Sequence, residues 1–339
     1  MKKQLGIAIV GCGLISRFHL KALQEIESYR VTGIWDKLPE AADKVAQDYK
    51  VGTFATLEAL LMDPDTDVVD ICLPSGLHAE YGCLATAAGK HVIVEKPIDI
   101  SIEAAQKLLN SAASHGVYVA EILQNRFSPS VKKIKKALDE NQLGRLLAGE
   151  ATIKWFRNEQ YYASSQWKGT KKLDGGGALI NQSIHTIDLF LWFMGEVKQL
   201  TSMVQTAYHQ IEVEDLAMIL TEFQNGAMGT ITASTALKPG FPERIELYGE
   251  KGSIALESGK IVRWKVEGCR EEDYLDPASI HSGSSDPAGI SAELHQLQFA
   301  EIAQALLNGV EPPVGGADAL RTLQFILAVY EADRKWIKL

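Results

Sequence analysis

Two glycines and a later aspartate follow short apolar runs near the beginning of the sequence. Gly11 and Gly13 come directly after the run 5–10, and Asp36 comes directly after the run 31–35. The first glycine permits a tight turn, and the second lets the backbone approach a pyrophosphate, which the N–H groups of a following helix would bind. An acid about 20 residues further on is placed to bind ribose hydroxyls. This spacing predicts a dinucleotide-binding turn.

The third small position of the glycine pattern is Ser16, which is not glycine or alanine but is small enough to keep a helix close to its strand. Leu14 and Ile15 complete the turn and are expected to border the cofactor. Asp36 should repel a 2′-phosphate, so we expect NAD in preference to NADP, although Lys37 leaves some room for a phosphate.

A lysine suited to acid–base chemistry follows another apolar run. Glu95 and Lys96 come directly after the run at 91–94. In open parallel sheets ligands bind beyond the carboxyl ends of the strands, so this loop is expected to border the cofactor. Pro74, Ser75 and His78 belong to a second such loop and are expected at the same edge. For His78 alone, a place in the first turn of a helix is an equally good interpretation.

Polar residues at helical spacing follow three glycines at 175–177. Asn181, His185 and Asp188 are four and three positions apart, which would stack them on one face of a helix. Short polar side chains favour a hydrogen-bonded site over a solvated face. The alternative is a structural network in which Asp188 or Asn181 bonds His185. No HExxH pattern or second His or Cys cluster accompanies them, so we expect no metal.

The periodicity of apolar residues divides the chain into two expected domains and indicates a combined α/β and α+β fold class. Residues 1–124 alternate apolar runs with helical patterns, which predicts a doubly wound parallel sheet of the Rossmann type. Residues 125–339 predict an α/β domain for substrate binding and oligomerisation, with a large, mostly antiparallel sheet. Its last helical patterns, 290–307 and 317–332, would cover the sheet or pack back on the first domain. The expected strands are 5–10, 31–35, 68–73, 91–95 and 117–122, then 147–155, 200–208, 212–223, 227–234, 244–248 and 252–256.

Composition limits the possible partners of the chain. It has 339 residues, a formal net charge of -9 and no long basic run, which argues against nucleic acid and anionic membranes. No stretch has the apolar length of a membrane-spanning helix, and residues 1–3 lead directly into a strand, so we expect a cytoplasmic protein without a signal peptide. The four cysteines are scattered without CxxC pairs and are expected to be reduced.

The motifs together resemble the glucose-fructose oxidoreductase, inositol dehydrogenase and rhizopine-catabolism (Gfo/Idh/MocA) family, and the resemblance covers nearly the whole chain. It rests on the glycine turn, on Glu95-Lys96-Pro97 and on the glycines followed by Asn181, His185 and Asp188. Further matching segments are Asn125-Arg126-Phe127, Trp167-Lys168-Gly169 and Pro312-Pro313. The resemblance implies that Lys96 and His185 border the nicotinamide and the substrate carbon, and that Glu95, Lys96, Asn125 and Arg126 contact the cofactor.

The resemblance implies hydride transfer between NAD(P) and a secondary alcohol or ketone of a sugar, cyclitol or nucleotide sugar. His185 suits the proton transfer because an unperturbed histidine titrates near pH 6.5. Lys96 is the alternative proton acceptor, or it stabilises the alkoxide by its charge. Asn181 stands where inositol-dehydrogenase-like members have an aspartate. Because it cannot titrate, it is expected to orient the substrate or His185.

Several side chains are expected to recognise a polyhydroxylated ring. Trp167 offers an apolar face, and Lys168 offers a cation for a carboxylate or phosphate unless it is an ordinary surface charge. The expected substrate-binding residues are Lys96, Arg126, Trp167, Lys168, Asn181 and His185.

Two other functions fit the same residues. One is an NAD-dependent glycosidase that oxidises its sugar transiently, and the other is a nonenzymatic NAD-binding regulator. The presence of both Lys96 and His185 argues against the regulator. The family resemblance also implies a homodimer or homotetramer.

Overall fold

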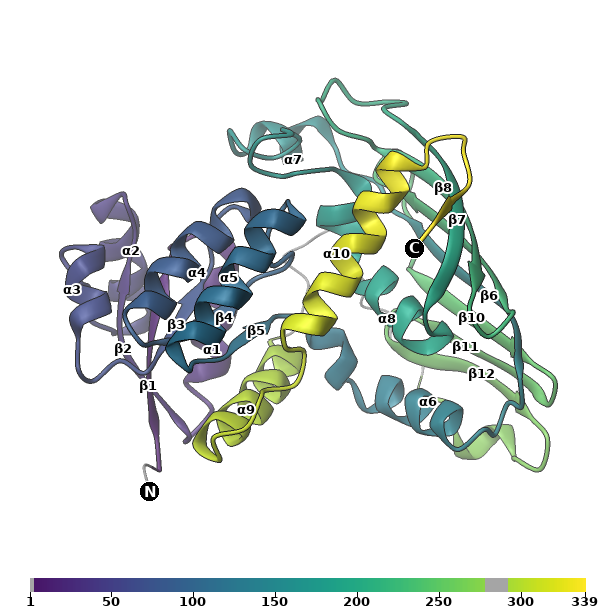
Figure 1. The fold of residues 1–339 in the computed structure, drawn as a ribbon, viewed down its shortest axis with the longest axis horizontal. Helices are drawn as coiled ribbons and strands as arrows, with labels where there is room; N and C mark the ends of the chain where they lie inside the picture. The colour runs from purple at the N-terminus through teal and green to yellow at the C-terminus, as the bar shows by residue number, and fades with distance from the viewer. Residues whose placement is uncertain (1–2, 278–291) are drawn as a thin grey trace. The chain divides into compact units, whose positions relative to one another are not determined.

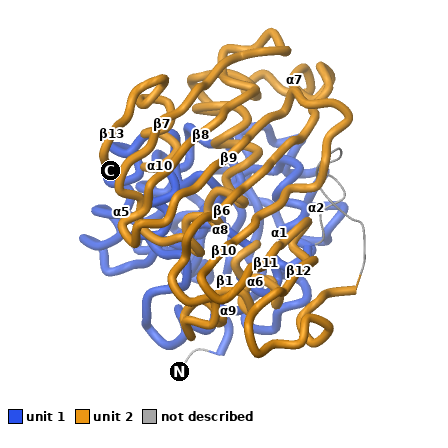
Figure 2. The backbone as a smooth tube through the Cα atoms, turned by 90° about the vertical axis from the view of Figure 1, so that its right-hand side faces the viewer, with its two compact units in different colours: residues 1–124, 291–323 blue, residues 125–290, 324–339 orange. Residues whose placement is uncertain are grey.

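The computed structural model describes residues 3–277 and 292–339, and the chain forms two compact units (Figure 2). Unit 1 contains Met1–Gln124 and Ser291–Leu323, and unit 2 contains Asn125–Ile290 and Gln324–Leu339. Each unit is therefore built from two separate stretches of the chain.

Unit 1 contains a five-stranded parallel sheet with the strand order β2-β1-β3-β4-β5 (Figure 1). All residues of β1 and β3 are buried, as expected for strands covered on both faces. The predicted doubly wound parallel sheet is confirmed. The bounds of its strands are Leu5–Val10 (β1), Tyr29–Trp35 (β2), Val68–Ile71 (β3), His91–Val94 (β4) and Val119–Glu121 (β5).

The helices of unit 1 pack in pairs, with α1 against α9 and α4 against α5. The side chains of Thr56 and Ser101 accept N–H groups at the starts of α3 and α5 and so define where these helices begin. Phe299 and Ile302 of α9 lie in the same hydrophobic core as β1. The helices are Leu14–Leu23 (α1), Pro39–Tyr49 (α2), Leu57–Met62 (α3), His78–Ala87 (α4), Ile102–His115 (α5) and Glu293–Leu307 (α9). Of the helix expected at 290–307, residues 290 and 291 lie outside the described part of the chain.

Unit 2 contains an eight-stranded sheet with the order β12-β11-β10-β6-β9-β8-β7-β13. All neighbouring strands are antiparallel except β6 and β9, which are parallel, so the predicted mostly antiparallel sheet is confirmed. The strands are Leu146–Lys154 (β6), Val197–Gln205 (β7), Leu216–Phe223 (β8), Met228–Ser234 (β9), Arg244–Gly249 (β10), Gly252–Glu257 (β11), Lys260–Val266 (β12) and Ile337–Lys338 (β13).

The turn between β7 and β8 corrects two expected strands. Asp215 accepts the backbone N–H groups of Ala207, Tyr208 and His209, at 2.6, 2.9 and 2.8 Å. These bonds fold residues 206–215 into a turn. Strand β7 therefore ends before the expected position 208, and β8 begins after the expected position 212. Two strands were not predicted: β12, in which charged residues interrupt the alternation, and the two-residue β13.

Helix α8, Ile184–Met194, packs on one face of the sheet in unit 2 (Figure 1). A Cβ atom at Gly149 would lie 2.6 Å from the sulfur of Met194, and one at Gly229 would lie 3.0 Å from the ring of Phe190. Two strand glycines therefore let this helix approach the sheet closely. The remaining helices of unit 2 are Pro129–Asp139 (α6) and Glu159–Ala163 (α7); α10, Gly316–Glu331, begins in unit 1 and ends in unit 2.

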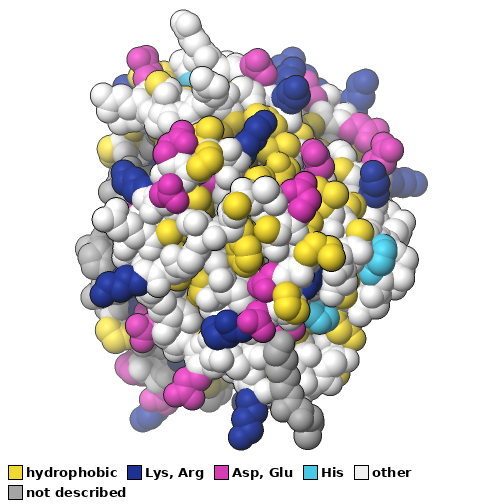
Figure 3. Space-filling model, turned by 90° about the vertical axis from the view of Figure 1, so that its left-hand side faces the viewer, with side chains coloured by type: hydrophobic (Ala, Val, Ile, Leu, Met, Phe, Trp, Pro, Cys, Tyr) yellow, Lys and Arg dark blue, Asp and Glu magenta, His cyan; other side chains and the backbone are white. Residues whose placement is uncertain are grey.

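Within the described ranges, no helix combines the length and the apolar character that crossing a membrane requires. On the face drawn in Figure 3, acidic and basic side chains are scattered among and around apolar ones.

Candidate active site

The glycine turn of unit 1 has the geometry that a dinucleotide requires. Gly11 has a φ of +98°, and a Cβ atom there would lie 2.6 Å from the carbonyl oxygen of Cys72. A Cβ atom at Gly13 would meet no atom within 4 Å, so this glycine faces open space that a ligand can enter. Ser16 is fully buried, and its hydroxyl donates to the Gly13 carbonyl at 2.8 Å. Ser16 was expected only to be small enough for this position, and its hydrogen bond also stabilises the turn.

Asp36 lies beside this turn, directly after β2. One of its carboxylate oxygens accepts the N–H of Cys12 at 2.8 Å, and the other accepts the N–H of Leu38 at 2.9 Å. Carboxylate oxygens can accept more than one hydrogen bond each, so both can still bind a ribose hydroxyl. Leu14, at the start of α1, is 59% exposed and is more exposed than the other apolar side chains of the turn, Cys12 and Ile15.

The loop after β3 contains Pro74, Ser75 and His78, and the ring of His78 has a structural role in it. The ring is 1% exposed; its Nδ1 lies 2.6 Å from the carbonyl oxygen of Pro97 and its Nε2 lies 2.8 Å from that of Leu73. Burial lowers the pKa of His78. These contacts favour the interpretation of His78 as a first-turn residue that ties this loop to the one after β4.

Glu95 directs its carboxylate into the interior of unit 1. One oxygen lies 3.1 Å from His19 Nε2, and the other accepts the N–H of Lys96 at 3.0 Å. Burial opposes ionisation, yet the hydrogen bond and charge of His19 lower the pKa of Glu95 to about 2. Burial likewise opposes a charge on His19, but the carboxylate of Asp70 holds the pKa of that imidazole well above its usual range. The side chain of Glu95 therefore fixes the loop that carries Lys96, whereas the sequence had placed it against the cofactor.

The three glycines of unit 2 allow a local departure from α-helical geometry. The N–H groups of Gly177 and Leu179 donate to the carboxylate of Glu214 at 2.9 and 2.8 Å, and a Cβ atom at Gly177 would lie 1.9 Å from the Glu214 carbonyl oxygen. The chain then forms a π-helix, Ala178–Ser183, before α8 begins. Asn181 therefore lies in the π-helix, and His185 lies in the first turn of α8.

The three polar residues of this segment have different surroundings. The side-chain amide of Asn181 donates to Asp174 at 2.5 Å and accepts from Gln182 at 3.1 Å. His185 is half-buried in the first turn of α8. Asp188 is buried. Asn181 is thus held in one orientation by Asp174.

Arg126 and Asp188 form a buried ion pair within unit 2. The guanidinium donates to both carboxylate oxygens, at 2.7 and 2.6 Å, and lies 5.1 Å from the ring centre of Trp192. Arg126 is 5% exposed and Asp188 is 1% exposed. The sequence had assigned Arg126 to cofactor and substrate, and Asp188 to the support of His185. The structure pairs them, and this bidentate bond anchors α8 to the segment Gln124–Phe127.

A group of cations and aromatic rings surrounds Gln182. Arg157 donates to Gln182 at 2.9 Å, and Gln182 donates to the hydroxyl of Tyr161 at 2.7 Å. The ammonium of Lys168 lies 4.2 Å from the ring centre of Tyr161, and burial lowers the pKa of Lys168. Trp167, next to it, is half-buried. The structural roles of Gln182, Asp174 and Glu214 were not predicted, although Asp174 stands directly before the three glycines.

Both halves of the chain match models of one family. Residues 5–122 match the oxidoreductase family with an NAD-binding Rossmann fold, and residues 131–255 match the GFO/IDH/MocA C-terminal domain. The chain belongs to the GFO/IDH/MocA family of oxidoreductases. The predicted family, its enzymatic class and NAD as the cofactor are confirmed.

Relatives match over nearly the whole length of the chain. The uncharacterized oxidoreductase YrbE of Bacillus subtilis is 28% identical over 332 residues, which cover 95% of this chain and 92% of the relative. The inositol 2-dehydrogenase of Rhizobium meliloti is 26% identical, over 93% of this chain and 92% of its own. The crystal structure of the WlbA dehydrogenase from Bordetella pertussis, in complex with NADH and UDP-GlcNAcA, has a TM-score of 0.89 at 27% identity and covers 99% of each chain.

Proposed function

We propose that this protein transfers a hydride between NAD and a secondary alcohol or ketone of a sugar, cyclitol or nucleotide sugar. The observation that carries the proposal is the glycine turn of unit 1, which is open at Gly13 and hydrogen-bonded to Asp36. The loop after β4 of the same unit carries Lys96. The second unit supplies the half-buried imidazole of His185 and the fixed amide of Asn181. Besides its cofactor, a dehydrogenase needs groups that accept a proton, stabilise an alkoxide and orient the substrate, and these side chains are suited to those roles.

Oxidation of an alcohol releases a hydride to the nicotinamide and a proton to a base. His185 is suited to accept this proton, and the charge of Lys96 is suited to stabilise the alkoxide that forms; the reverse assignment uses the same two groups. Asn181, held by Asp174, would orient the substrate hydroxyl through its amide. Among the cofactor residues of the sequence analysis, the proposal keeps Gly11, Gly13, Leu14, Ile15, Asp36, Pro74, Ser75, Lys96 and Asn125.

The residues around Gln182 support a substrate with a ring and an anionic group. Tyr161 and Trp167 offer aromatic faces, and Lys168 and Arg157 offer cations. Sugar rings stack on aromatic faces, and carboxylates or phosphates pair with such cations. The relative WlbA was crystallised with UDP-GlcNAcA, and this agrees with a nucleotide sugar as one member of the proposed class.

The role of Lys96 is tested by Lys96→Ala, with Lys107→Ala as a matched control on the exposed face of α5. We expect Lys96→Ala to abolish turnover of the substrate that wild-type protein oxidises best. NAD affinity, measured by calorimetry, should stay within about tenfold, or 1.4 kcal/mol, because the glycine turn and Asp36 are untouched. Lys107→Ala should behave as wild type. Normal turnover by Lys96→Ala would remove this lysine from the chemistry.

We propose further that the protein acts as a homodimer or homotetramer in the cytoplasm, without nucleic acid or membrane as a partner. The acidic net charge supports the exclusion of polyanions. An apolar strip on the sheet of unit 2, formed by Met203, Met218, Leu220 and Met228, supports the oligomer.

A further inference from the structure

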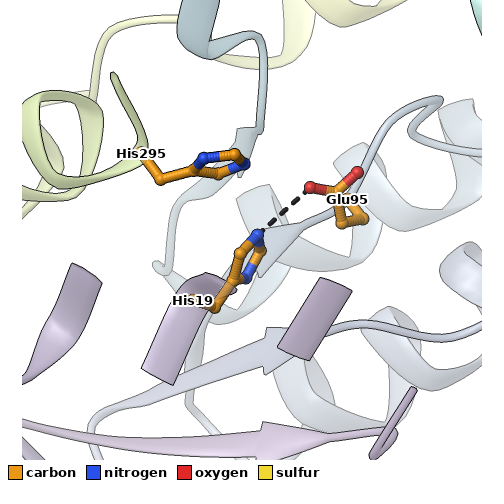
Figure 4. A group of neighbouring side chains, drawn as sticks. All are labelled: His19, Glu95 and His295. Carbon is orange, nitrogen blue, oxygen red and sulfur yellow. Dashed lines mark hydrogen bonds and ion pairs between the residues drawn. The ribbon is translucent and has the colours of Figure 1, made fainter. Parts of the chain in front are cut away.

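Three buried side chains converge in unit 1 (Figure 4). His19 comes from α1, Glu95 from the end of β4 and His295 from α9. One ligand atom of each lies within 4.8 Å of the ligand atoms of the other two, and the two imidazole centres are 5.2 Å apart. No local spacing in the sequence relates these residues, which explains why the sequence analysis expected no metal.

The imidazole of His295 is the unusual member of this cluster. The residue is 1% exposed, and neither ring nitrogen has a hydrogen-bond partner among the described residues. Leaving a buried donor or acceptor unsatisfied costs roughly 1–3 kcal/mol. Such a ring, which lies beside a carboxylate and a second imidazole, is therefore expected to bind something that the described residues do not supply.

The charges of the cluster identify what is missing. Asp70 lies on the far side of the His19 ring, with its oxygen 2.8 Å from Nδ1, while Glu95 lies 3.1 Å from Nε2. A proton on His19 would serve both carboxylates, and the charge of Lys96 also acts on Glu95, but neither of these cations satisfies the ring of His295. A divalent cation would neutralise both carboxylates and would bind His295 as well. An imidazole whose far nitrogen donates to a carboxylate is the usual arrangement of a metal-binding histidine.

We propose that His19, Glu95 and His295 bind one divalent transition-metal ion of the Zn²⁺ type, with Asp70 orienting His19. Two imidazole nitrogens and one carboxylate oxygen are ligands that suit Zn²⁺ and similar ions, whereas Mg²⁺ and Ca²⁺ prefer oxygen ligands. The ion joins α1, the end of β4 and α9, and so fixes the separate C-terminal segment of unit 1 and the loop that carries Lys96. Hydride transfer to NAD does not require it, so the site lies beyond the proposed function.

A second group of potential ligands, made by His19, Asp70 and Cys72, carries less weight. His19 Nδ1 lies 2.8 Å from Asp70 and 3.3 Å from the sulfur of Cys72, so the facing atoms of this group already have partners. Asp70 Oδ1 also lacks a partner among the described residues, but both ring nitrogens of His19 have one.

The test uses the full chain, freed of metal by a chelator and then titrated with Zn²⁺ against a chromophoric competitor. We expect one ion per chain at micromolar affinity or tighter. His295→Leu, which keeps an apolar side chain in the core, should weaken binding by about 100-fold or more. His115→Ala, at an exposed imidazole near the end of α5, should bind like wild type. Co²⁺ in place of Zn²⁺ should give visible absorption bands that His295→Leu lacks.

Two results would overturn the proposal: wild-type protein that retains no ion after loading and gel filtration, or equal affinities of wild type and His295→Leu. If His295→Leu does not fold, Glu95→Gln takes its place, since it keeps the shape of the side chain and removes the charge. An unchanged Co²⁺ spectrum in Glu95→Gln would equally contradict the site. Binding is measured without NAD or substrate, so the result is independent of the proposed function.

Discussion

Asp36 combines two roles at the edge of the glycine turn. Its carboxylate holds the N–H groups of Cys12 and Leu38, and in the proposed complex it also accepts the ribose hydroxyls. We expect Asp36→Ser to weaken NAD binding by about 10- to 100-fold, because hydrogen bonds to a charged group contribute roughly 1.5–3 kcal/mol. The affinity for NADP should fall much less, because Asp36→Ser also removes the repulsion between the carboxylate and the 2′-phosphate.

Calorimetric titration of both cofactors measures this effect, with Asp43→Ser, an exposed carboxylate on α2, as the control. Equal losses for NAD and NADP would show that Asp36 only supports the turn and does not select the cofactor.

At the scale of elements, the π-helix before α8 depends on one buried carboxyl. Glu214 accepts N–H groups from Gly177 and Leu179 and the hydroxyl of Tyr330, and burial raises its pKa to about 7. Between about pH 4.5 and pH 7 the folded state therefore retains a proton that the unfolded state has released. Stability thus falls as the pH rises through this window, by roughly 2–3 kcal/mol.

Urea unfolding at pH 5 and pH 8 tests this dependence. Glu214→Gln cannot titrate, so its stability relative to wild type should rise by that amount between the two pH values. Glu212→Gln, an exposed neighbour, should follow wild type. Parallel profiles for wild type and Glu214→Gln would show that Glu214 is already ionised at pH 5.

The anchor of α8 gives a second prediction at this scale. Asp188→Ala would leave the guanidinium of Arg126 buried without its carboxylate, so we expect a loss of about 3–5 kcal/mol in the free energy of unfolding. The double variant Arg126→Leu/Asp188→Leu should lose much less, because no uncompensated charge remains. Urea unfolding of wild type, Asp188→Ala and the double variant measures these losses. If the double variant is as unstable as Asp188→Ala, the lost stability comes from packing and not from the unpaired charge.

The sequence predicted those elements whose signal is local. The unbroken apolar run 5–10 and the glycines after it led to β1 and the turn, and the alternation in 227–234 led to β9. The π-helix was missed because it depends on Glu214, 37 residues after Gly177. The pairing of Arg126 with Asp188 and the convergence of His295 on His19 were missed for the same reason: they join distant segments and leave no periodic pattern.

At the scale of the whole molecule, one face of the unit 2 sheet exposes an apolar strip. Met203 and Met218 are cross-strand neighbours, and with Leu220 and Met228 they are each more than half exposed. Patches of this kind usually mark an interface, and an identical copy of the chain is the partner that symmetry favours.

We expect light scattering at micromolar protein to give the mass of a dimer or tetramer. Leu220→Lys should lower that mass, because it places a charge in the strip, whereas Leu84→Lys, on the exposed face of α4 in unit 1, should leave it unchanged. A monomeric mass for the wild-type protein would contradict the proposed assembly.

The most direct test of the central claim is the absorbance of reduced nicotinamide when wild-type protein is mixed with NAD and a panel of sugars, cyclitols and nucleotide sugars. We predict an increase with at least one member of the panel, larger with NAD than with NADP and absent in Lys96→Ala. No reduction with any of these compounds, in a protein that binds NAD by calorimetry, would contradict the proposed hydride transfer to this class of substrate.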